Sequence, residues 1–307
     1  MDFTLRQLEI FLKVVDFQSV TKASEDLYLS QPAVSIQLKK LQDQFDIPLT
    51  EVVGRQLYVT DFGKELAGSA RKILAEVDVI NYSRKEFQGE LAGRLKLSIA
   101  STAKYVMPYF LADFMSRHSG VDLVMDVTNK TRVVTSLENN EVDFSLVSVL
   151  PTQLKLNRVE LMSNKLYLVG GTALKRKPKT SPGQILTTQS LLFRESGSAT
   201  RSAMEHFLTS RKLPAFKKIE LTSNEALKQA IVAGLGYSIM PLIGIKNELR
   251  NGDMEIIKMK GLPIVTHWNL VWLKTKKLSP VAEAYLEFIQ KEKERIIADK
   301  FGWVEEY

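Results

Sequence analysis

The residues best suited to do chemistry in this chain stand at the start of a short amphipathic segment. Ser30 can cap a helix through its hydroxyl, and Pro32 is tolerated in a first turn because the amides there lack intrahelical partners. Apolar residues then recur at helical spacing and would form a buried face: Val34, Leu38, Leu41 and Phe45. Polar side chains that suit base edges and phosphates occupy the other faces: Gln31, Ser35, Gln37 and Lys39. This pattern is typical of a helix that enters the major groove of DNA, although an ordinary helical hairpin has the same spacing.

A second set of polar side chains follows strands in the remainder of the chain. From residue 94 onward, strands of period two alternate with helices, which indicates a parallel sheet covered by helices. Ligands bind at the carboxyl ends of such strands, often at helix N-termini. Ser101 and Thr102 follow the predicted strand 95–99, and Asn129 and Thr131 follow the strand 121–127. These four residues are candidate ligand contacts; helix capping is the alternative role, and one side chain can serve both.

The elements that position the DNA-reading residues are three helices and a hairpin. Apolar spacing predicts helices over residues 5–17, from Ser19 onward, and from Ser30 to Phe45. Residues 53–60 predict a β-hairpin that turns at Gly54-Arg55, and a hairpin after a third helix is a wing. Arg55 at its tip could reach a phosphate or the minor groove. The candidate DNA-binding residues are therefore Ser30, Gln31, Pro32, Ser35, Gln37, Lys39 and Arg55.

A long helix is expected between residues 61 and 91. Its apolar positions alternate at spacings of four and three, as in a coiled-coil seam: Leu66, Ala70, Ile73, Val77, Ile80, Arg84, Phe87 and Leu91. About 25 residues at 1.5 Å each extend for about 38 Å, which is longer than one domain requires. We therefore expect two subunits to pair here, the alternative being a helix packed on its own core. Gly63 and Gly68 indicate that the helix begins late.

Composition limits the class of protein. The chain has 307 residues, enough for two or three domains, and no cysteine, which excludes disulfides and thiolate metal sites. The N-terminus lacks a basic segment followed by an apolar run, so we expect no signal peptide. No apolar stretch approaches the roughly 20 residues of a membrane helix. We expect a cytoplasmic protein with no membrane partner.

The net charge of +7 is unevenly distributed along the chain. Residues 1–90 contain 11 Lys and Arg against 14 Asp and Glu, a balance of −3, whereas the remaining residues contain 31 against 21. The overall charge is therefore no evidence for DNA binding. A local stripe would have to supply the phosphate contacts, from Lys22, Lys39, Lys40 and Arg55. The later excess favours an anionic ligand or is solvated surface.

Residues 5–63 resemble the N-terminal domain of LysR-type transcriptional regulators. The matching positions, in order, are Leu8, Phe11, Ala23, Leu27, Ser30 to Ser35, Gln37, Leu41, Pro48, Leu49, Gly54, Arg55, Leu57, Thr60 and Gly63. The chain departs from the family at Thr50, where Phe is usual, and at Val52, where Arg is common. The resemblance implies an α+β multidomain protein. A winged helix-turn-helix and a linker helix would precede an α/β effector domain of periplasmic-binding-protein type with two subdomains.

The resemblance also implies boundaries and an effector site. A DNA-binding domain would span residues 1–60, the dimerisation helix 61–91, one effector subdomain 92–164 with 267–307, and the other 165–266. Residues 101–104, 194–198 and 223–226 are most similar to the branch that controls carbon-fixation operons. The candidate effector-binding residues are Ser101, Thr102, Lys104, Asn129, Thr131, Ser148, Arg194, Ser198, Thr200 and Ser223. Lys104, Lys130 and Arg194 favour an anionic effector.

The implied function is sequence-specific transcriptional regulation controlled by a small molecule. Its partners would be a promoter inverted repeat in double-stranded DNA, a second subunit through the linker helix, a tetramer, and RNA polymerase. No cofactor or metal is expected.

Two other functions were weighed against this one. Catalysis finds little support, because the three histidines are scattered and no H-E-x-x-H, G-x-S-x-G or P-loop motif occurs. A solute-binding protein would explain the α/β part, but it would need an export signal and leave the first ninety residues without a role.

Overall fold

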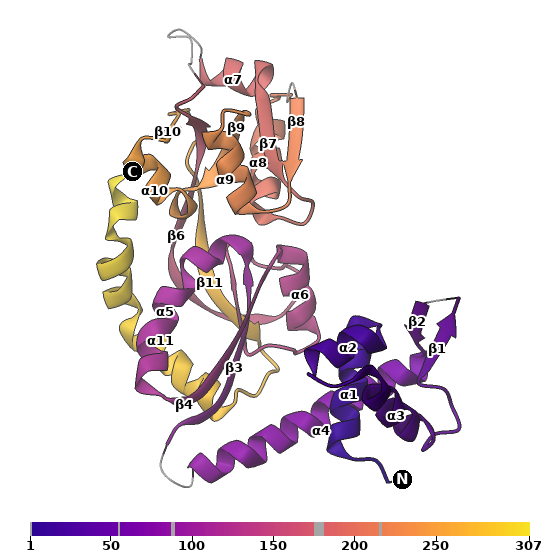
Figure 1. Cartoon of the computed structure of the whole chain (residues 1–307). Helices are drawn as coiled ribbons and strands as arrows, with labels where there is room; N and C mark the ends of the chain where they lie inside the picture. The colour runs from indigo at the N-terminus through magenta and orange to yellow at the C-terminus, as the bar shows by residue number, and fades with distance from the viewer. Residues whose placement is uncertain (1, 55, 87–89, 175–180, 215–216) are drawn as a thin grey trace. The chain divides into compact units, whose positions relative to one another are not determined.

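Three short helices, a hairpin and a long helix make up the first part of the chain. The computed structural model describes residues 2–54, 56–86, 90–174, 181–214 and 217–307, with backbone alone for residues 78 and 81–86. The chain forms two compact units, Met1–Glu90 and Leu91–Tyr307 (Figure 1). The first contains α1 (Leu5–Phe17), α2 (Val20–Asp26), α3 (Gln31–Gln42), β1 (Thr50–Val53), β2 (Gln56–Val59) and α4 (Asp61–Glu86).

Local capping starts each of the three short helices. Thr4 and Gln7 form a capping box at α1, and the hydroxyl of Ser19 accepts the Lys22 amide at α2. The Ser30 hydroxyl accepts the Ala33 amide at α3, so the predicted cap is confirmed. Each cap satisfies an amide that has no partner within its own helix.

The apolar backs of these helices fill two small cores around α1. Leu8 and Phe11 pack with Leu41 of α3 and with Leu49, whereas Ile10 and Val14 pack with Val34. Val34 and Leu41 are fully buried, which fixes the orientation of α3. The polar faces of α3 are thereby held toward solvent.

Helix α4 begins at Asp61, so the expected late start is wrong. The Thr60 hydroxyl accepts the Gly63 amide at 3.0 Å and starts the helix. Gly63 is required for close packing, because a Cβ atom there would overlap the Leu49 carbonyl oxygen. The first part of α4 packs on α1 through Ala67 and Ala70, as in the single-domain alternative.

The predicted seam divides along α4. Ile73 is 40% exposed and Ile80 is 70% exposed, whereas Ala70 is buried in the unit's own core. The side chains of Arg84 and Phe87 lie outside the described residues. Leu91 falls beyond the helix and packs on the core of the second unit, which corrects the last seam position.

The second unit contains one nine-stranded sheet. Its strands run in the order β4-β3-β5-β11-β6-β9-β7-β8, and β10 pairs with β6. Their bounds are β3 (Ala92–Ala100), β4 (Gly120–Thr128), β5 (Phe144–Val147), β6 (Leu156–Gly171), β7 (Ser190–Arg194), β8 (Lys217–Leu221), β9 (Tyr237–Pro241), β10 (Met254–Ile256) and β11 (Ile264–Leu273). Strand β3 is parallel to β4 and β5, and β7 to β8 and β9, as the alternating pattern predicts.

Two long antiparallel strands, β6 and β11, join the two halves of this unit (Figure 1). We call the half around β3, β4 and β5 subdomain 1, and the half around β7, β8 and β9 subdomain 2. The apolar run 166–169 alone predicts a strand in this part of the sequence, but β6 begins ten residues earlier, at Leu156. Asn164 and Thr266 are opposite each other in the pair, and the Asn164 amide donates to the Thr266 hydroxyl at 3.0 Å.

Helices cover both faces of the sheet. Subdomain 1 has η1 (Ser101–Tyr105), α5 (Met107–Arg117), α6 (Lys130–Glu138), α11 (Pro280–Phe301) and η3 (Gly302–Glu306). Subdomain 2 has α7 (Pro182–Thr188), α8 (Ala199–Ser210), α9 (Asn224–Val232), η2 (Leu242–Gly244) and α10 (Lys246–Asn251). Successive residues of one strand face opposite sides, so Leu146 joins the core under α5 and α11, whereas Val147 packs under α6.

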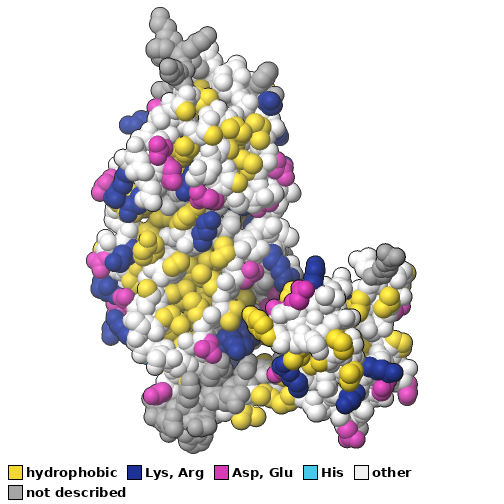
Figure 2. Space-filling view, viewed as in Figure 1, with side chains coloured by type: hydrophobic (Ala, Val, Ile, Leu, Met, Phe, Trp, Pro, Cys, Tyr) yellow, Lys and Arg dark blue, Asp and Glu magenta, His cyan; other side chains and the backbone are white. Residues whose placement is uncertain are grey.

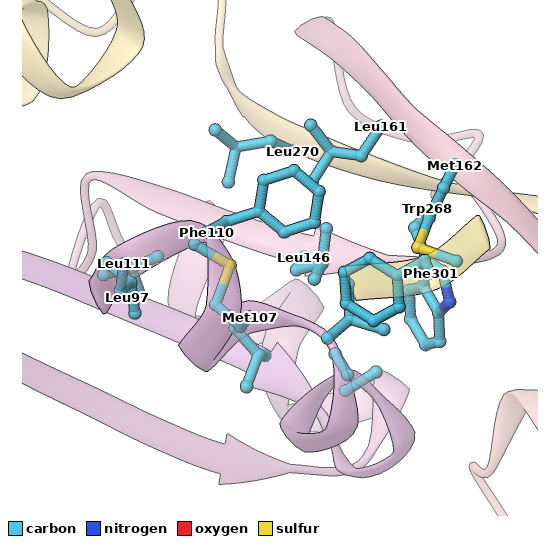
Figure 3. Packing of buried hydrophobic residues seen from close by; sticks show 14 of the residues in the cluster. Leu97, Met107, Phe110, Leu111, Leu146, Leu161, Met162, Trp268, Leu270 and Phe301 are labelled. Carbon is cyan, nitrogen blue, oxygen red and sulfur yellow. The ribbon is translucent and has the colours of Figure 1, made fainter. Parts of the chain in front are cut away.

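The largest core passes through both subdomains. Figure 3 shows Phe110 of α5 and Phe301 of α11 converging with Trp268 of β11, and Met162 of β6 lies beside them. Trp268 is fully buried. Because the long strands contribute to this core, the two subdomains share packing where they join.

We predict opposite effects for alanine at two glycines of α4. Gly63→Ala should destabilise the first unit by about 1–3 kcal/mol, because its Cβ would overlap backbone. Gly68→Ala meets nothing within 4 Å and should stabilise the helix by about 0.5–1 kcal/mol. All three tryptophans lie in the second unit, so hydrogen exchange of α1 peptides is the suitable measurement. Equal exchange in the two variants would contradict the packing.

Candidate functional site

The candidate DNA-reading face is the polar side of α3. Gln31, Pro32 and Lys39 are exposed, and Ser35 and Gln37 are half-buried. Ser30 is exposed, and its hydroxyl, which accepts the Ala33 amide in the helix cap, can still donate its own proton. Arg55 lies outside the described residues. Lys and Arg side chains lie among Asp and Glu on the visible face of the first unit, in keeping with its negative balance (Figure 2).

Two residues beside this face were not predicted. Tyr28 is 96% exposed in the turn between α2 and α3, with φ of 53°. Ile36 is 55% exposed on α3 itself. Ile36 lies outside the apolar stripe of α3, and this position was the only indication in the sequence that its side chain would be exposed. For Tyr28, the turn position gave no indication of its exposure.

In the second unit, one serine hydroxyl connects the two subdomains. Ser101 begins η1 in subdomain 1, and its Oγ accepts from Arg194 Nη1 and Nη2, both at 3.2 Å. Asn224, the first residue of α9, donates to the same oxygen through Nδ2 at 3.3 Å. Arg194 is 2% exposed and Asn224 is 3% exposed. Three buried donors of subdomain 2 thus converge on one acceptor of subdomain 1.

Arg194 carries its own counterion. Its Nε and Nη2 donate to the two carboxylate oxygens of Glu195, each at 2.8 Å. This bidentate pair neutralises the guanidinium inside the protein and holds it in a fixed plane. Arg194 therefore orients Ser101 and offers no free charge to a ligand, which differs from the anion-binding role expected for it.

The polar groups that stay free around Ser101 are complementary. With its lone pairs occupied by Arg194 and Asn224, the Ser101 hydroxyl can still donate its own proton. The buried Oδ1 of Asn224 has no hydrogen-bond partner among the described residues. A donor and an acceptor thus lie side by side at the contact between the subdomains.

Two helix N-termini meet close to this point. Asn129 Oδ1 accepts the Arg132 amide at the start of α6, and the Ser198 hydroxyl caps α8. Gly197, with φ of 84°, passes so close that a Cβ atom there would lie 2.7 Å from the Thr131 hydroxyl oxygen. The starts of α6 and α8 therefore lie close together, and the first-turn amides of a helix favour anions. Thr102, in η1, and Thr200, in the first turn of α8, are both buried.

A cavity of about 340 Å³ opens beside the two helix starts. It is bounded by Lys130 of subdomain 1, by Ser202 and His206 of α8, and by Thr266 of β11. Its walls are mainly apolar, with these few polar groups, as is usual for small-molecule sites. Ser148 is half-buried and precedes Val149, which lines the same cavity. We call this space the cleft cavity.

Two predicted effector residues lie elsewhere. Lys104 lines a different cavity with Lys228, and its ammonium lies 5.1 Å from the Tyr105 ring centroid. The Ser223 hydroxyl accepts the Ala226 amide and caps α9, and the residue is exposed. Of the other eight, Arg194 contacts Ser101, and Asn129 and Thr131 lie beside Gly197, next to the cap residue Ser198.

Sequence reasoning missed the residues that complete the cluster. Glu195 and Asn224 were visible only as neighbours of chosen residues, and Gly197 only as a loop glycine. Arg201 was also missed: its Nη1 donates to the Arg194 carbonyl oxygen at 3.1 Å. Hydrogen bonds to Glu220 and Glu205 raise the pKa of Arg201 above its ordinary value, so it stays charged while it holds this loop.

The described residues offer neither a metal site nor a membrane-spanning helix. No group of three or more His, Asp or Glu could hold a metal ion there. Within the same residues, every helix is too short or too polar to cross a membrane.

We predict that Ser101→Ala destabilises the second unit. The change leaves donors of Arg194 and Asn224 without their acceptor inside the protein, at a cost of about 1–3 kcal/mol. Denaturant unfolding followed by tryptophan fluorescence reports on this unit, because all three tryptophans belong to it. Ser196→Ala, at an exposed position of the neighbouring loop, is the matched control. Identical midpoints for both variants would show that Ser101 does not join the subdomains.

Comparison with known proteins agrees with this architecture. Residues 5–64 match the bacterial regulatory helix-turn-helix protein family, lysR type, and residues 88–294 match the LysR substrate binding domain. The RuBisCO operon transcriptional regulator of Allochromatium vinosum is 35% identical over 300 residues, covering 96% of this chain and 98% of that protein. The transcriptional activator CmpR of Synechocystis is 33% identical over 290 residues, covering 93% and 94%.

A solved structure agrees as well. The regulatory domain of CcmR from Synechocystis, in complex with 2-PG, has a TM-score of 0.60 and 28% identity, covering 64% of this chain and 95% of that one. The predicted fold class and the similarity to the carbon-fixation branch are confirmed, and the relatives are named as regulators rather than enzymes. This chain belongs to the LysR family of transcriptional regulators.

Proposed function

We propose that the chain binds a promoter inverted repeat as a dimer. Its binding to DNA changes when a small anion occupies the space between the two subdomains. The proposal that an effector binds between the subdomains rests on one observation: Arg194 and Asn224 of subdomain 2 both donate to the Ser101 hydroxyl of subdomain 1. A ligand that satisfies Ser101 and Asn224 differently in open and closed arrangements has the differential affinity that a switch requires.

The DNA contacts would be made by the exposed start of α3. Gln31, Ser35 and Gln37 would meet base edges, and Lys39 and Arg55 the phosphates. Ser30 and Pro32 would place the start of α3 against the sugar–phosphate backbone of the DNA. The negative balance of residues 1–90 supports recognition through few, well-placed contacts, because little overall attraction is available.

The effector would be held mainly by backbone amides at two helix N-termini and by the ammonium group of Lys130. Arg194 is neutralised by Glu195, so the ligand's charge would face the amides at the starts of α6 and α8 and the ammonium of Lys130. Ser101, Asn129, Thr131 and Ser198 would complete the polar wall. The complex of the related CcmR regulatory domain with 2-PG supports a small ligand of this kind.

Pairing would use the exposed part of α4. Ile73 and Ile80 are apolar and exposed one heptad apart, as a coiled-coil partner requires. Pairing through α4 would also set the spacing between half-sites on DNA. A tetramer, contact with RNA polymerase and a cytoplasmic location complete the proposal, with domains at 1–60, 61–91, 92–164 with 267–307, and 165–266.

DNA recognition is tested by removing two polar groups of α3. Gln31→Ala combined with Ser35→Ala should weaken specific binding by about 1–3 kcal/mol per lost base contact. The measurement is a mobility shift on the DNA upstream of the protein's own gene, at fixed moderate salt. Ser69→Ala, exposed on α4, is the control. Unchanged affinity in the double variant would remove α3 from the major groove.

The effector site is tested with 2-PG as the probe. Wild type should show a rise in melting temperature on addition of 2-PG, since a ligand that binds only the native state stabilises it. Lys130→Met should reduce this rise by removing the cation of the cleft cavity, whereas Lys155→Met, at an exposed position, should not. A full response in Lys130→Met would place the anion elsewhere.

A further inference from the structure

A second cavity of about 310 Å³ is lined in part by Lys104 and Tyr105 of η1 and shares no lining residue with the cleft cavity. Subdomain 1 contributes Lys104, Tyr109, Lys300 and Trp303 to it, and subdomain 2 contributes Lys228 and Lys246. We call it the lysine cavity. Its volume is within the range of small-molecule sites, and it spans both subdomains.

Three of its four lysines have no carboxylate partner. Lys228 pairs with Glu248 at 2.8 Å and with Glu225 at 3.0 Å, and is therefore neutralised. Burial opposes the charge of Lys228, but hydrogen bonds to these two carboxylates outweigh it and raise its pKa. Within the described part of the chain, Lys104, Lys246 and Lys300 form no ion pair. Glu225 interacts electrostatically with Lys104, and Asp113 with Lys300, but neither forms an ion pair. Four lysines against one glutamate, Glu248, line the cavity, and this excess of positive charge favours a ligand with more than one negative charge.

Aromatic rings form the rest of the wall. The ammonium of Lys246 lies 4.7 Å from the Trp303 ring centroid, and the Tyr307 ring meets the indole edge-on, with 6.2 Å between centroids. Tyr109 is 49% exposed and is braced edge-on by Phe301, with 5.4 Å between ring centroids. Trp303 is half-buried, unlike Trp268 and Trp272, which are buried. Planar rings stack on such surfaces.

We propose that the lysine cavity binds a polyanion that carries a planar ring, the chemistry of a nucleoside diphosphate. Lys104, Lys246 and Lys300 hold the phosphates, and Trp303 or Tyr109 stacks on the base. A single carboxylate would leave most of this charge uncompensated, and a ligand without a ring would leave the aromatic wall unused.

The lysine cavity and the hydrogen bonds to Ser101 share the same pair of short elements, η1 and α9. η1 has Ser101 at one end, in the junction cluster, and Lys104 and Tyr105 at the other, in the lysine cavity. α9 has Asn224 in the cluster and, one turn later, Lys228 in the cavity. A ligand that draws η1 toward α10 therefore acts on the Ser101–Asn224 contact. This coupling rests on the proposed function, whereas the binding itself does not.

Binding is measured on the full-length protein without DNA, using ADP, adenosine and pyrophosphate as probes. ADP should quench the fluorescence of Trp303, the least buried tryptophan, and calorimetry should give its affinity. Adenosine and pyrophosphate should each bind about tenfold more weakly than ADP, since each offers only half of the required contacts. Absence of ADP binding at millimolar concentration, or pyrophosphate binding as tightly as ADP, would overturn the proposal.

Variants place the ligand within the molecule. Lys246→Ala combined with Lys300→Ala should raise the dissociation constant for ADP by about tenfold or more, whereas Lys291→Ala, exposed on α11, should not change it. Ser101→Ala should retain ADP binding. Loss of ADP binding in Ser101→Ala with retention in the double lysine variant would mean that ADP occupies the cleft cavity, which would refute this site and leave the proposed function intact.

Discussion

The hydrogen bonds that converge on Ser101 determine how the two subdomains of the second unit meet. A buried guanidinium is tolerated only when its donors are satisfied, and here Glu195 and Ser101 satisfy them together. Because Ser101 belongs to the other subdomain, satisfying Arg194 requires the subdomains to approach. The need of the buried Arg194 guanidinium for hydrogen-bond acceptors thus constrains how the two subdomains are arranged.

The first unit follows a similar logic with apolar rather than polar contacts. Val34 and Leu41 bury one side of α3, and the capped start of the helix must then face water. Gly63 allows α4 to approach the Leu49 backbone, which closes the small core behind α3. Neither feature touches DNA, yet both fix the direction in which the polar residues of α3 project.

Local features were predictable from sequence, and contacts between distant segments were not. The cap at Ser30 and the strand–helix rhythm depend on neighbours a few positions apart, so they could be inferred from spacing. Arg194 and Ser101 are 93 positions apart and Asn224 and Ser101 are 123 apart, so no local pattern connects them. The effector-binding role of Arg194 stays a prediction, and its contacts with Glu195 and Ser101 are what the structure adds.

Prediction also failed where signals were short or mixed. The first ten residues of β6 include charged and polar side chains on a half-exposed stretch, which hid the strand. Helices α7 and α10 have seven and six residues, too few for a periodic pattern. Lys104 was assigned to the effector site by its nearness in sequence to Ser101, but η1 carries the two side chains to different cavities.

The connection between the subdomains has a mechanical consequence. β6 and β11 are joined by a continuous antiparallel ladder, with one irregularity between Trp268 and Asn269. Such a ribbon resists stretching and shear, since either would break hydrogen bonds, but it twists easily. Opening and closing should therefore be a rotation about the ribbon axis through a small angle. The displacement is least near the ribbon and greatest at its far ends, so a small ligand beside the axis can move distant surfaces by a lever effect.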